Sequence, residues 1–226
     1  MMRKEILLKV DYTLLEDCNE DDIQNLCLKA INLGVKSVCV YPKWVKLCSE
    51  LLKESEILVC TVIDFPFGNN DIQFKNQESK DAIESGVDEL DVVIDNSKLN
   101  NPKLLLGELT SWVDFCHQYH NKNGEQIILK VIVESGQLSL NETEIATHIC
   151  IGSGVDFIKT STGKLGVGAE LEKVTLMRSV IEKEKSNLQI KASGGIRTLE
   201  QIDQFYPYVN RFGMGYKSVD SLIENT

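Results

Sequence analysis

The alternation of short apolar segments with amphipathic segments constrains the fold of this chain more than any other feature of its sequence. Each apolar segment is followed by a stretch with apolar residues at helical spacing, as at Ile23, Leu26 and Ala30. Short apolar strands between amphipathic helices indicate a parallel sheet that is covered on both faces. The expected strands are residues 6–10, 35–40, 57–63, 87–94, 127–133, 155–158, 188–192 and 211–214.

Eight such units are enough to close a (β/α)8 barrel, or TIM barrel, in a chain of 226 residues. No linker or low-complexity tract divides the sequence, so we expect an α/β protein with a single domain over residues 1–226. An open, doubly wound sheet is the alternative. Residues 11–19, the first turn from strand to helix, lack the glycine fingerprint with which such sheets bind dinucleotides, and this favours the barrel.

The acidic composition limits the classes of partner. A formal net charge of -10 disfavours nucleic acids and anionic membranes, because both reward positive charge. The first apolar run is too short for a signal peptide, and no later stretch is long enough to span a bilayer. We therefore expect a cytoplasmic protein.

The sequence offers little for a metal site. Its seven cysteines are scattered and form no C-x-x-C pair, a pattern typical of reduced cytosolic thiols. His117 and His120 are spaced as helix neighbours and could share a metal ion, but no third ligand lies nearby in sequence. We interpret them as part of a polar helix face and expect no metal.

Residues 156–164 contain a lysine directly after a short apolar strand. Lys159 would lie at the dry end of that strand, where an uncharged amine is easier to hold than in water, and such an amine is a potential nucleophile. Gly163 and Lys164 follow in a turn that could bind an anion. The alternative is a lysine that extends to the surface from an ordinary strand.

The carboxyl ends of all strands converge on one mouth of a barrel. The loops after strands seven and eight are the usual phosphate site of this architecture, and here they contain Gly194, Gly195 and Gly213. A phosphorylated small molecule is therefore the expected ligand. The reactive or polar residues at or near the mouth are Asp11, Thr13, Cys39, Thr61, Asp91, Lys130, Glu134, Lys159, Lys164 and Lys191.

Lys159 and Lys191 come from neighbouring expected strands. Two positive charges within about 4–6 Å lower each other's pKa, so one amine is expected to be neutral near pH 7. A neutral amine adds to a carbonyl and forms an imine, which withdraws electrons from the neighbouring carbon bond. Carboxylates would then carry protons.

Five polar or thiol positions, some of them among the residues named above, also have simpler interpretations. Cys39 is expected to line a pocket rather than to act as a nucleophile, because no histidine lies nearby in sequence. Lys130 and Glu134 could form a structural ion pair. Residues 88–89, both acidic, are expected on a solvated loop or rim.

These residues carry a resemblance to a known family. The sequence resembles the deoxyribose-phosphate aldolases, which are class I aldolases, over nearly its whole length. The run 157–163, Phe-Ile-Lys-Thr-Ser-Thr-Gly, is the most specific match. The matching segments are residues 11–15, 37–42, 65–68, 89–94, 129–136, 156–164 and 191–197.

The resemblance implies cleavage of 2-deoxy-D-ribose 5-phosphate to D-glyceraldehyde 3-phosphate and acetaldehyde, without a metal or another cofactor. It implies that Lys159 forms the Schiff base, that Lys191 is the cation that lowers its pKa, and that Asp91 and an ordered water act as general acid and base. A homodimer is also consistent with the family. The substrate-binding residues that it implies are Asp11, Thr13, Cys39, Lys130, Thr160, Gly163, Lys164, Gly194, Gly195, Arg197, Gly213 and Gly215.

The sequence departs from the family pattern in two places. After the last strand the family usually has Gly-(Thr or Ala)-Ser-Ser, whereas residues 213–217 read Gly-Met-Gly-Tyr-Lys. The Gly215 backbone or Lys217 could replace the lost hydroxyl contacts with phosphate. The chain also reaches Thr226 without the tyrosine-ended tail that some members fold over the site, from which slower proton transfer is expected.

Two alternatives to the deoxyribose-phosphate reaction remain. One is another lysine-dependent aldolase of the same fold with a different sugar or sugar phosphate, and the altered residues 213–217 motivate it. The other is a barrel that binds a sugar phosphate without catalysis. The joint presence of Lys159, Lys191 and Asp91 speaks against the second, because binding alone needs no activated amine.

Overall fold

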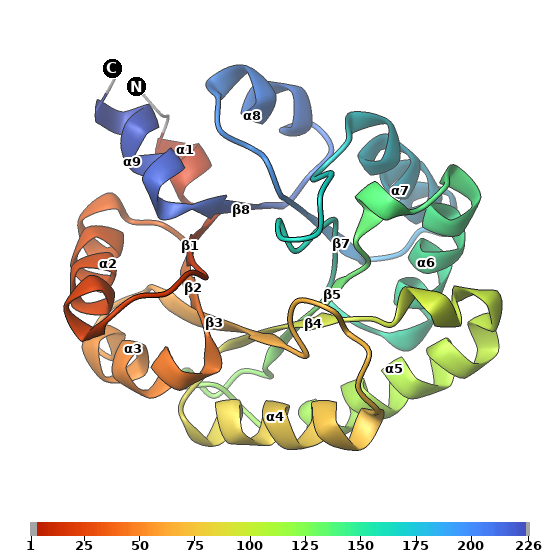
Figure 1. Cartoon of the computed structure of the whole chain (residues 1–226), viewed down its shortest axis with the longest axis horizontal. Helices are drawn as coiled ribbons and strands as arrows, with labels where there is room; N and C mark the ends of the chain where they lie inside the picture. The colour runs from red at the N-terminus through yellow and green to blue at the C-terminus, as the bar shows by residue number, and fades with distance from the viewer. Residues whose placement is uncertain (1–3, 225–226) are drawn as a thin grey trace.

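The computed structural model describes residues 4–224, which form a closed barrel of parallel strands inside a ring of helices (Figure 1). This confirms the expected (β/α)8 fold. The strands are β1 (Val10–Leu14), β2 (Ser37–Val40), β3 (Leu58–Ile63), β4 (Glu89–Val93), β5 (Ile128–Ile132), β6 (Phe157–Lys159), β7 (Gln189–Ser193) and β8 (Arg211–Gly215). The helices are α1 (Lys4–Leu7), α2 (Glu20–Leu33), α3 (Val45–Leu52), α4 (Ile72–Glu84), α5 (Pro102–Cys116), α6 (Leu140–Ser153), α7 (Leu171–Lys183), α8 (Leu199–Phe205) and α9 (Tyr216–Glu224).

The strands pair in chain order, and β8 returns to β1 to close the barrel. In the last ladder Val10 lies opposite Phe212, and in the ladder between β6 and β7 Lys159 lies opposite Lys191. Parallel pairing of this kind puts every carboxyl strand end at the same mouth. Residues far apart in sequence are therefore brought to one place by the register alone.

The apolar core lies between the outer face of the barrel and the helices. Trp112 of α5 is fully buried there, and its indole N–H donates to the hydroxyl of Ser79 on α4 at 2.9 Å. Inside the barrel, near the mouth, charged side chains take the place of apolar ones, and five of them are completely buried. These five are Asp11, Glu89, Asp91, Lys130 and Lys191.

Helix boundaries follow the capping signals in the sequence in most places. Asn19 caps α2 in a reciprocal pair with Asp22, and Gly34 ends the helix with a φ of 65°. Asn101 caps α5, with Pro102 as the first helical residue. Residue preferences at helix ends predict caps at Asn19, Gly34 and Asn101 from the sequence, and the structure confirms all three.

The sequence interpretation was wrong for one strand and for one helix cap. Residues 6–10 are not the first strand: Ile6 and Leu7 belong to the short helix α1, and β1 begins at Val10. Periodicity alone does not separate a short helical turn from a strand in so short an apolar run. The sequence also suggests Asn141 and Glu144 as the capping pair of α6, but in the structure the pair is Ser139 with Glu142.

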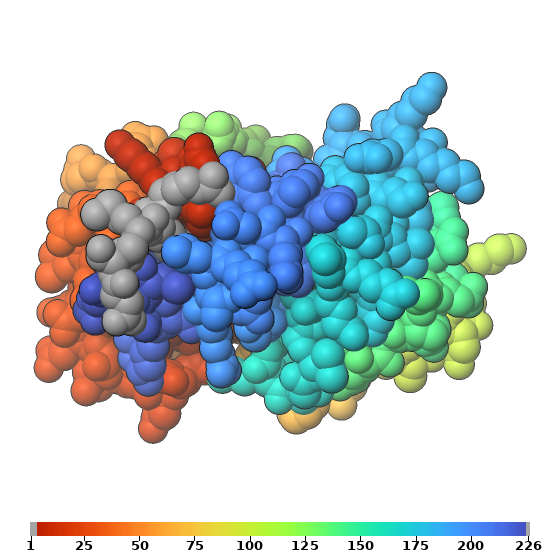
Figure 2. Space-filling view, turned by 90° about the horizontal axis from the view of Figure 1, so that it is seen from above, coloured from red at the N-terminus to blue at the C-terminus, as the bar shows by residue number. Residues whose placement is uncertain are grey.

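The two ends of the described chain lie side by side. Helices α1 and α9, at the red and blue ends of the colour range, are neighbours on one side of the barrel (Figures 1 and 2). Residues 225–226, after which a family tail would continue, lie outside the described part. Among residues 4–224, no helix combines the length and apolar character needed to cross a bilayer.

Candidate active site

The centre of the site is the carboxylate of Asp91 on β4, which accepts hydrogen bonds from three lysines. Lys159 and Lys191 both donate to Oδ2 at 2.7 Å, and Lys130 donates to Oδ1 at 2.9 Å. Burial alone would raise the pKa of Asp91, but the three ammonium groups hold it well below its usual value. Asp91 is thus an anion that links strands β4, β5, β6 and β7.

Lys191 is held as a cation. Burial lowers its pKa, but ion pairs with Asp11 and Asp91 outweigh burial and raise the pKa above the ordinary lysine value. The expectation that two adjacent lysines lower each other's pKa omitted these carboxylates, and for Lys191 the direction is the opposite. Lys191 is suited to act as a fixed positive charge beside Lys159.

A second set of ion pairs lies deeper in the barrel. Glu89 accepts from Lys130 at 2.7 Å and from Arg211 of β8 at 2.9 Å, and Arg211 also donates to Asp11. The expectation that residues 88–89 form a solvated rim was wrong, because both are fully buried. Glu89 and Asp91 are two residues apart on one strand, so their side chains enter the barrel on the same side.

Glu134 is not the partner of Lys130, so that proposed ion pair was also wrong. Its side chain accepts a hydrogen bond from the backbone N–H of Thr162 at 2.9 Å, and its φ is 47°. Glu134 therefore supports the turn that follows Lys159. Thr160 supports the same region, since its hydroxyl donates to the Ser193 carbonyl at 2.8 Å and accepts from the Ser193 N–H at 2.9 Å.

The charges in this cluster do not balance. It contains the carboxylates of Asp11, Glu89 and Asp91, against the cations Lys130, Lys159, Lys191 and Arg211. Within the described chain, Lys159 has a carboxylate contact with Asp91 alone, and that oxygen is shared with Lys191. The cluster therefore contains one formal positive charge more than its carboxylates balance, which is unfavourable for buried groups.

Lys159 also lies on the floor of an open cavity of about 440 Å³ at the barrel mouth. Lys159 is therefore both buried among charges and reachable by a small molecule. The predicted residues that line this cavity are Thr13, Lys159, Gly163, Lys164, Gly194, Gly195, Arg197, Gly213 and Gly215. The predicted residues that lie beneath or beside it are Asp11, Cys39, Asp91, Lys130, Thr160 and Lys191.

Glycines shape the wall where a phosphate was predicted. Gly163, Gly194 and Gly195 all have positive φ, which other residues adopt at a cost. A Cβ at Gly194 would come within 2.8 Å of the Gly168 backbone, and a Cβ at Gly213 within 3.1 Å of Lys191 Cε. The wall is therefore made of exposed backbone in close contact with the charged cluster.

A sequence model of the DeoC/LacD family aldolases matches residues 6–205. The chain belongs to this family. It is 41% identical over 196 residues to the deoxyribose-phosphate aldolase of Mycoplasmoides pirum, covering 86% of each chain. It is also 41% identical over 203 residues to that of Caldicellulosiruptor saccharolyticus, covering 88% of this chain and 89% of the other.

Solved structures agree with this assignment. The fold superposes on the deoxyribose phosphate aldolase of Aeropyrum pernix with a TM-score of 0.84 and 26% identity, covering 96% of this chain and 88% of that one. The closed barrel of this DeoC/LacD family member is thus the fold that it shares with that structure.

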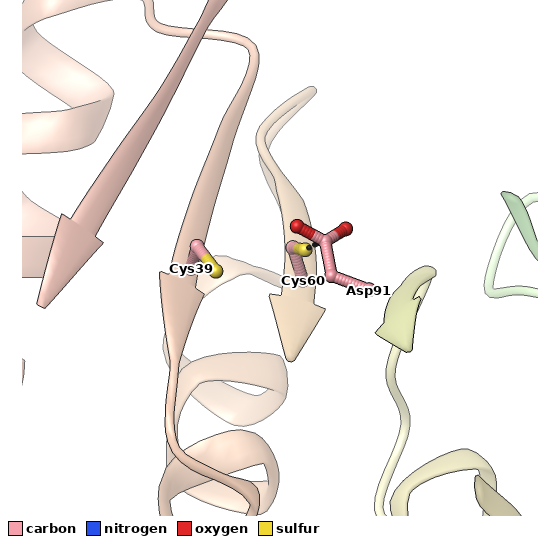
Figure 3. A group of neighbouring side chains, drawn as sticks. All are labelled: Cys39, Cys60 and Asp91. Atoms are coloured by element: carbon pink, nitrogen blue, oxygen red, sulfur yellow. Dashed lines mark hydrogen bonds between the residues drawn. The ribbon is translucent and has the colours of Figure 1, made fainter. Parts of the chain in front are cut away.

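Cys39 of this family member lies opposite Cys60 in the ladder between β2 and β3. Both thiols are fully buried. Their sulfur atoms and a carboxylate oxygen of Asp91 lie within 4.8 Å of one another (Figure 3). A hydrogen bond with Cys60 lowers the pKa of Cys39, whereas burial raises that of Cys60 well above its usual value. Cys39 is packed against the charged cluster rather than along the cavity wall.

Among residues 4–224, two groups of side chains have the spacing to hold a metal ion, namely Cys39 with Cys60 and Asp91, and Cys60 with Asp11 and Glu89. Their carboxylates, however, already accept from ammonium or guanidinium groups. Lys130 additionally donates to the Cys60 sulfur at 3.5 Å. Positive charges at these distances repel a divalent cation, so the donor set suits lysine chemistry better than a metal.

Sequence reasoning missed several functional positions. Arg211 was assigned only to a strand, although its cation completes the buried cluster. Its charge within an apolar strand was the available signal. Further cavity residues that were not predicted as part of the site are Leu14, Leu15, Glu16, Thr162, Ser193, Ile196, Tyr216 and Ser218.

Proposed function

We propose that this chain is a deoxyribose-phosphate aldolase that cleaves 2-deoxy-D-ribose 5-phosphate to D-glyceraldehyde 3-phosphate and acetaldehyde. One observation carries the proposal: Lys159 is a cavity-floor amine in a buried cluster with one cation more than its carboxylates. The curated relatives that the chain matches over most of its length bear this enzyme name. The cleavage belongs to deoxyribonucleotide and deoxynucleoside breakdown.

The proposed covalent step begins at Lys159. Its amine gives up a proton, adds to the C1 aldehyde of the open-chain sugar and expels water as the imine forms. Lys191 assists this step because its ammonium group donates to the same oxygen of Asp91 to which Lys159 donates. The carboxylate is therefore shared, and a charged Lys159 is less well stabilised than it would be with Asp91 to itself.

Carbon–carbon cleavage follows from the imine. Removal of the proton from the C3 hydroxyl turns C3 into an aldehyde, the C2–C3 bond breaks, and its electron pair moves toward the iminium nitrogen to give an enamine. D-glyceraldehyde 3-phosphate leaves. The enamine is then protonated at C2, and water releases acetaldehyde and restores Lys159. Asp91, acting through a water molecule, is the proposed proton carrier in both transfers.

The glycine wall is the proposed phosphate site. Backbone N–H groups near Gly163, Gly194 and Gly195 can donate to phosphate oxygens without a side chain in the way. Lys164 and Arg197 add positive charge at the same cavity. This end of the cavity would hold C5 of the sugar while C1 reaches Lys159.

Borohydride reduction tests the proposal directly. Wild-type protein treated with substrate and borohydride should gain a reduced, two-carbon or sugar-phosphate adduct on Lys159, located by peptide mass spectrometry. Lys159→Leu should form no adduct and lose activity, while Lys183→Leu, a change of the same kind at the end of α7, should behave like wild type. Absence of an adduct on Lys159 in the wild-type protein would falsify the aldolase proposal.

A second candidate is an aldolase that acts on a different or unphosphorylated sugar. The observation that favours it is the wall at residues 213–217, where Gly215 and Tyr216 stand in place of the family's usual serines. Comparison of kcat/KM for deoxyribose with and without its 5-phosphate separates the two candidates. A strong preference for the phosphate supports the first.

Three further properties are proposed with this function. The free cysteines and acidic composition support a cytoplasmic enzyme. A single domain over residues 1–226 should unfold in one cooperative transition. A homodimer is the expected assembly, and light scattering measures it.

A further inference from the structure

We propose that Glu16 is a specificity-determining residue, whose carboxylate competes with the substrate's phosphate for the cations at the cavity mouth. The inference rests on the proposed function for the identity of that anion. It is carried by the position of Glu16 and by the charges around it. Glu16 follows β1 in the loop that leads to α2, and it lines the same cavity as Lys159.

Glu16 is bound from across the cavity mouth. Its Oε1 accepts a hydrogen bond from Lys217 Nζ at 2.6 Å and from the Tyr216 hydroxyl at 3.4 Å. Both donors belong to the first turn of α9, directly after β8. The contact thus joins the loop after the first strand to the segment that differs from the usual family pattern.

The backbone on both sides holds this contact in place. Lys164 Nζ donates to the Leu15 carbonyl at 2.6 Å, which fixes the chain immediately before Glu16. The Tyr216 ring packs edge-on against Tyr12, with ring centroids 6.2 Å apart. These contacts of Leu15 and Tyr216 hold the backbone near Glu16 and the start of α9 at the cavity mouth. The Glu16 side chain can then reach Lys217.

The cavity lining is strongly positive apart from this one residue. Glu16 is the only acidic side chain among the described residues that line it, against the cations of Lys159, Lys164, Arg197 and Lys217. The hydrogen bond from Lys217 lowers the pKa of Glu16, so the carboxylate is ionised at neutral pH. The negative carboxylate of Glu16 therefore contacts a cation, Lys217, that we propose a substrate phosphate would also bind.

The pair is weak enough to exchange. The side chains of Lys217 and Glu16 remain 68% and 47% exposed, and ion pairs with this degree of exposure contribute little net stability. An arriving phosphate dianion can therefore take Lys217 from Glu16, but it must also approach a fixed negative charge. This electrostatic repulsion weakens binding of a phosphorylated substrate but not of the neutral sugar. Glu16 therefore lowers the ratio of kcat/KM for the phosphorylated sugar to kcat/KM for the free sugar.

The test uses Glu16→Gln, which keeps the shape of the side chain and removes its charge. The Kd for inorganic phosphate, measured by calorimetry, should fall about three- to tenfold at low salt, and the difference should shrink as salt is added. The ratio of kcat/KM for deoxyribose 5-phosphate to that for deoxyribose should rise by a similar factor, through KM rather than kcat. Glu16→Asp, which retains the charge, should stay near the wild-type ratio.

Matched variants identify the cause. Glu84→Gln removes an exposed carboxylate on α4 that pairs with Lys80 and does not line the cavity. This variant should change neither the Kd for phosphate nor the ratio of the two kcat/KM values. In a Lys217→Gln background the effect of Glu16→Gln should become smaller, because the two residues act on one contact.

Equal phosphate affinity in wild type and Glu16→Gln would overturn the inference, as would a change in kcat/KM of the same size for both sugars. Failure of the proposed function looks different: neither sugar would be cleaved and Lys159 would form no adduct. The phosphate measurement does not need turnover, so it decides the role of Glu16 in either case.

Discussion

Lys159 and Lys191 lie directly opposite each other on β6 and β7, and both donate to the same oxygen of Asp91 at 2.7 Å. The two amines are nevertheless not equivalent. Lys191 has a second carboxylate partner in Asp11 and is fully buried, whereas Lys159 lines the cavity. Because of this asymmetry, the amine of Lys159 can react with a molecule in the cavity, whereas Lys191 remains a positively charged ammonium group.

Replacement of Lys191 should therefore impair imine formation at Lys159. In Lys191→Met, Asp91 Oδ2 would serve Lys159 alone and stabilise its protonated form, so kcat should fall on the order of 100-fold. Lys191→Arg keeps the positive charge and should retain more activity than Lys191→Met. The measurement is the rate of borohydride-trapped adduct on Lys159 as a function of pH, together with a denaturation curve. A wild-type trapping rate in Lys191→Met would refute the role of the shared oxygen.

Removal of Arg211 should affect both stability and activity. Its guanidinium contacts Glu89 and Asp11 inside the barrel, so Arg211→Met leaves each of these buried carboxylates with one fewer cationic partner and should cost about 3 kcal/mol in the free energy of unfolding. Arg211→Met also removes the excess positive charge of the cluster around Lys159, and kcat should fall about tenfold or more.

Urea denaturation and steady-state kinetics measure the two effects of Arg211→Met separately. Arg211→Lys is the comparison, since it keeps the charge but loses the two-pronged contact. If Arg211→Met proved as stable as the wild-type protein, the deeper ion pairs would not hold the barrel together as we infer.

The fold could be predicted from the sequence because the barrel depends on a pattern that each segment displays locally. Apolar strands, amphipathic helices and caps such as Asn19 with Asp22 are readable without knowledge of distant contacts. The same locality explains the failure at residues 6–10, where one short apolar run suits a helical turn and a strand equally well.

The site was only partly predictable for a different reason. Lys159 and Lys191 could be found because each ends an apolar stretch before a glycine-containing turn. Glu89 and Arg211 could not be paired, because their contact joins positions 122 residues apart and depends on which side chains enter the barrel. Glu16 was missed because its partner, Lys217, comes from the opposite end of the chain.

Acid should destabilise the protein through the buried carboxylates. Neighbouring cations place the pKa of Asp11 and of Asp91 well below the usual value even though burial opposes this. Groups with a depressed pKa contribute stability above the unfolded pKa of about 3.9, and that stability is lost as the pH falls toward the folded value. Burial raises the pKa of Asp88 and Glu78, which act in the opposite direction.

With Asp11 and Asp91 dominant, the free energy of unfolding should stay nearly constant from about pH 7 to 5 and decline below about pH 4. Urea titrations across this range measure it, and Asp91→Asn should show a shallower decline. A protein that became more stable between pH 5 and 3 would contradict the assignment of both carboxylates as paired anions.

Gly213 should be intolerant of even one methyl group. A Cβ there would come within 2.8 Å of Ser193 Cβ and 3.1 Å of Lys191 Cε, so Gly213→Ala should displace Lys191 from Asp91. A shift of this size in a positioned group lowers kcat by about 10- to 100-fold. Gly107→Ala is the matched control, because its Cβ meets no atom within 4 Å and it lies inside α5, where alanine should add about 0.5–1 kcal/mol of stability. Steady-state kinetics on both variants decide the cause. A fall in kcat identifies displacement of Lys191, whereas a rise in KM for the phosphorylated sugar at unchanged kcat would show that Gly213 acts only through the phosphate wall.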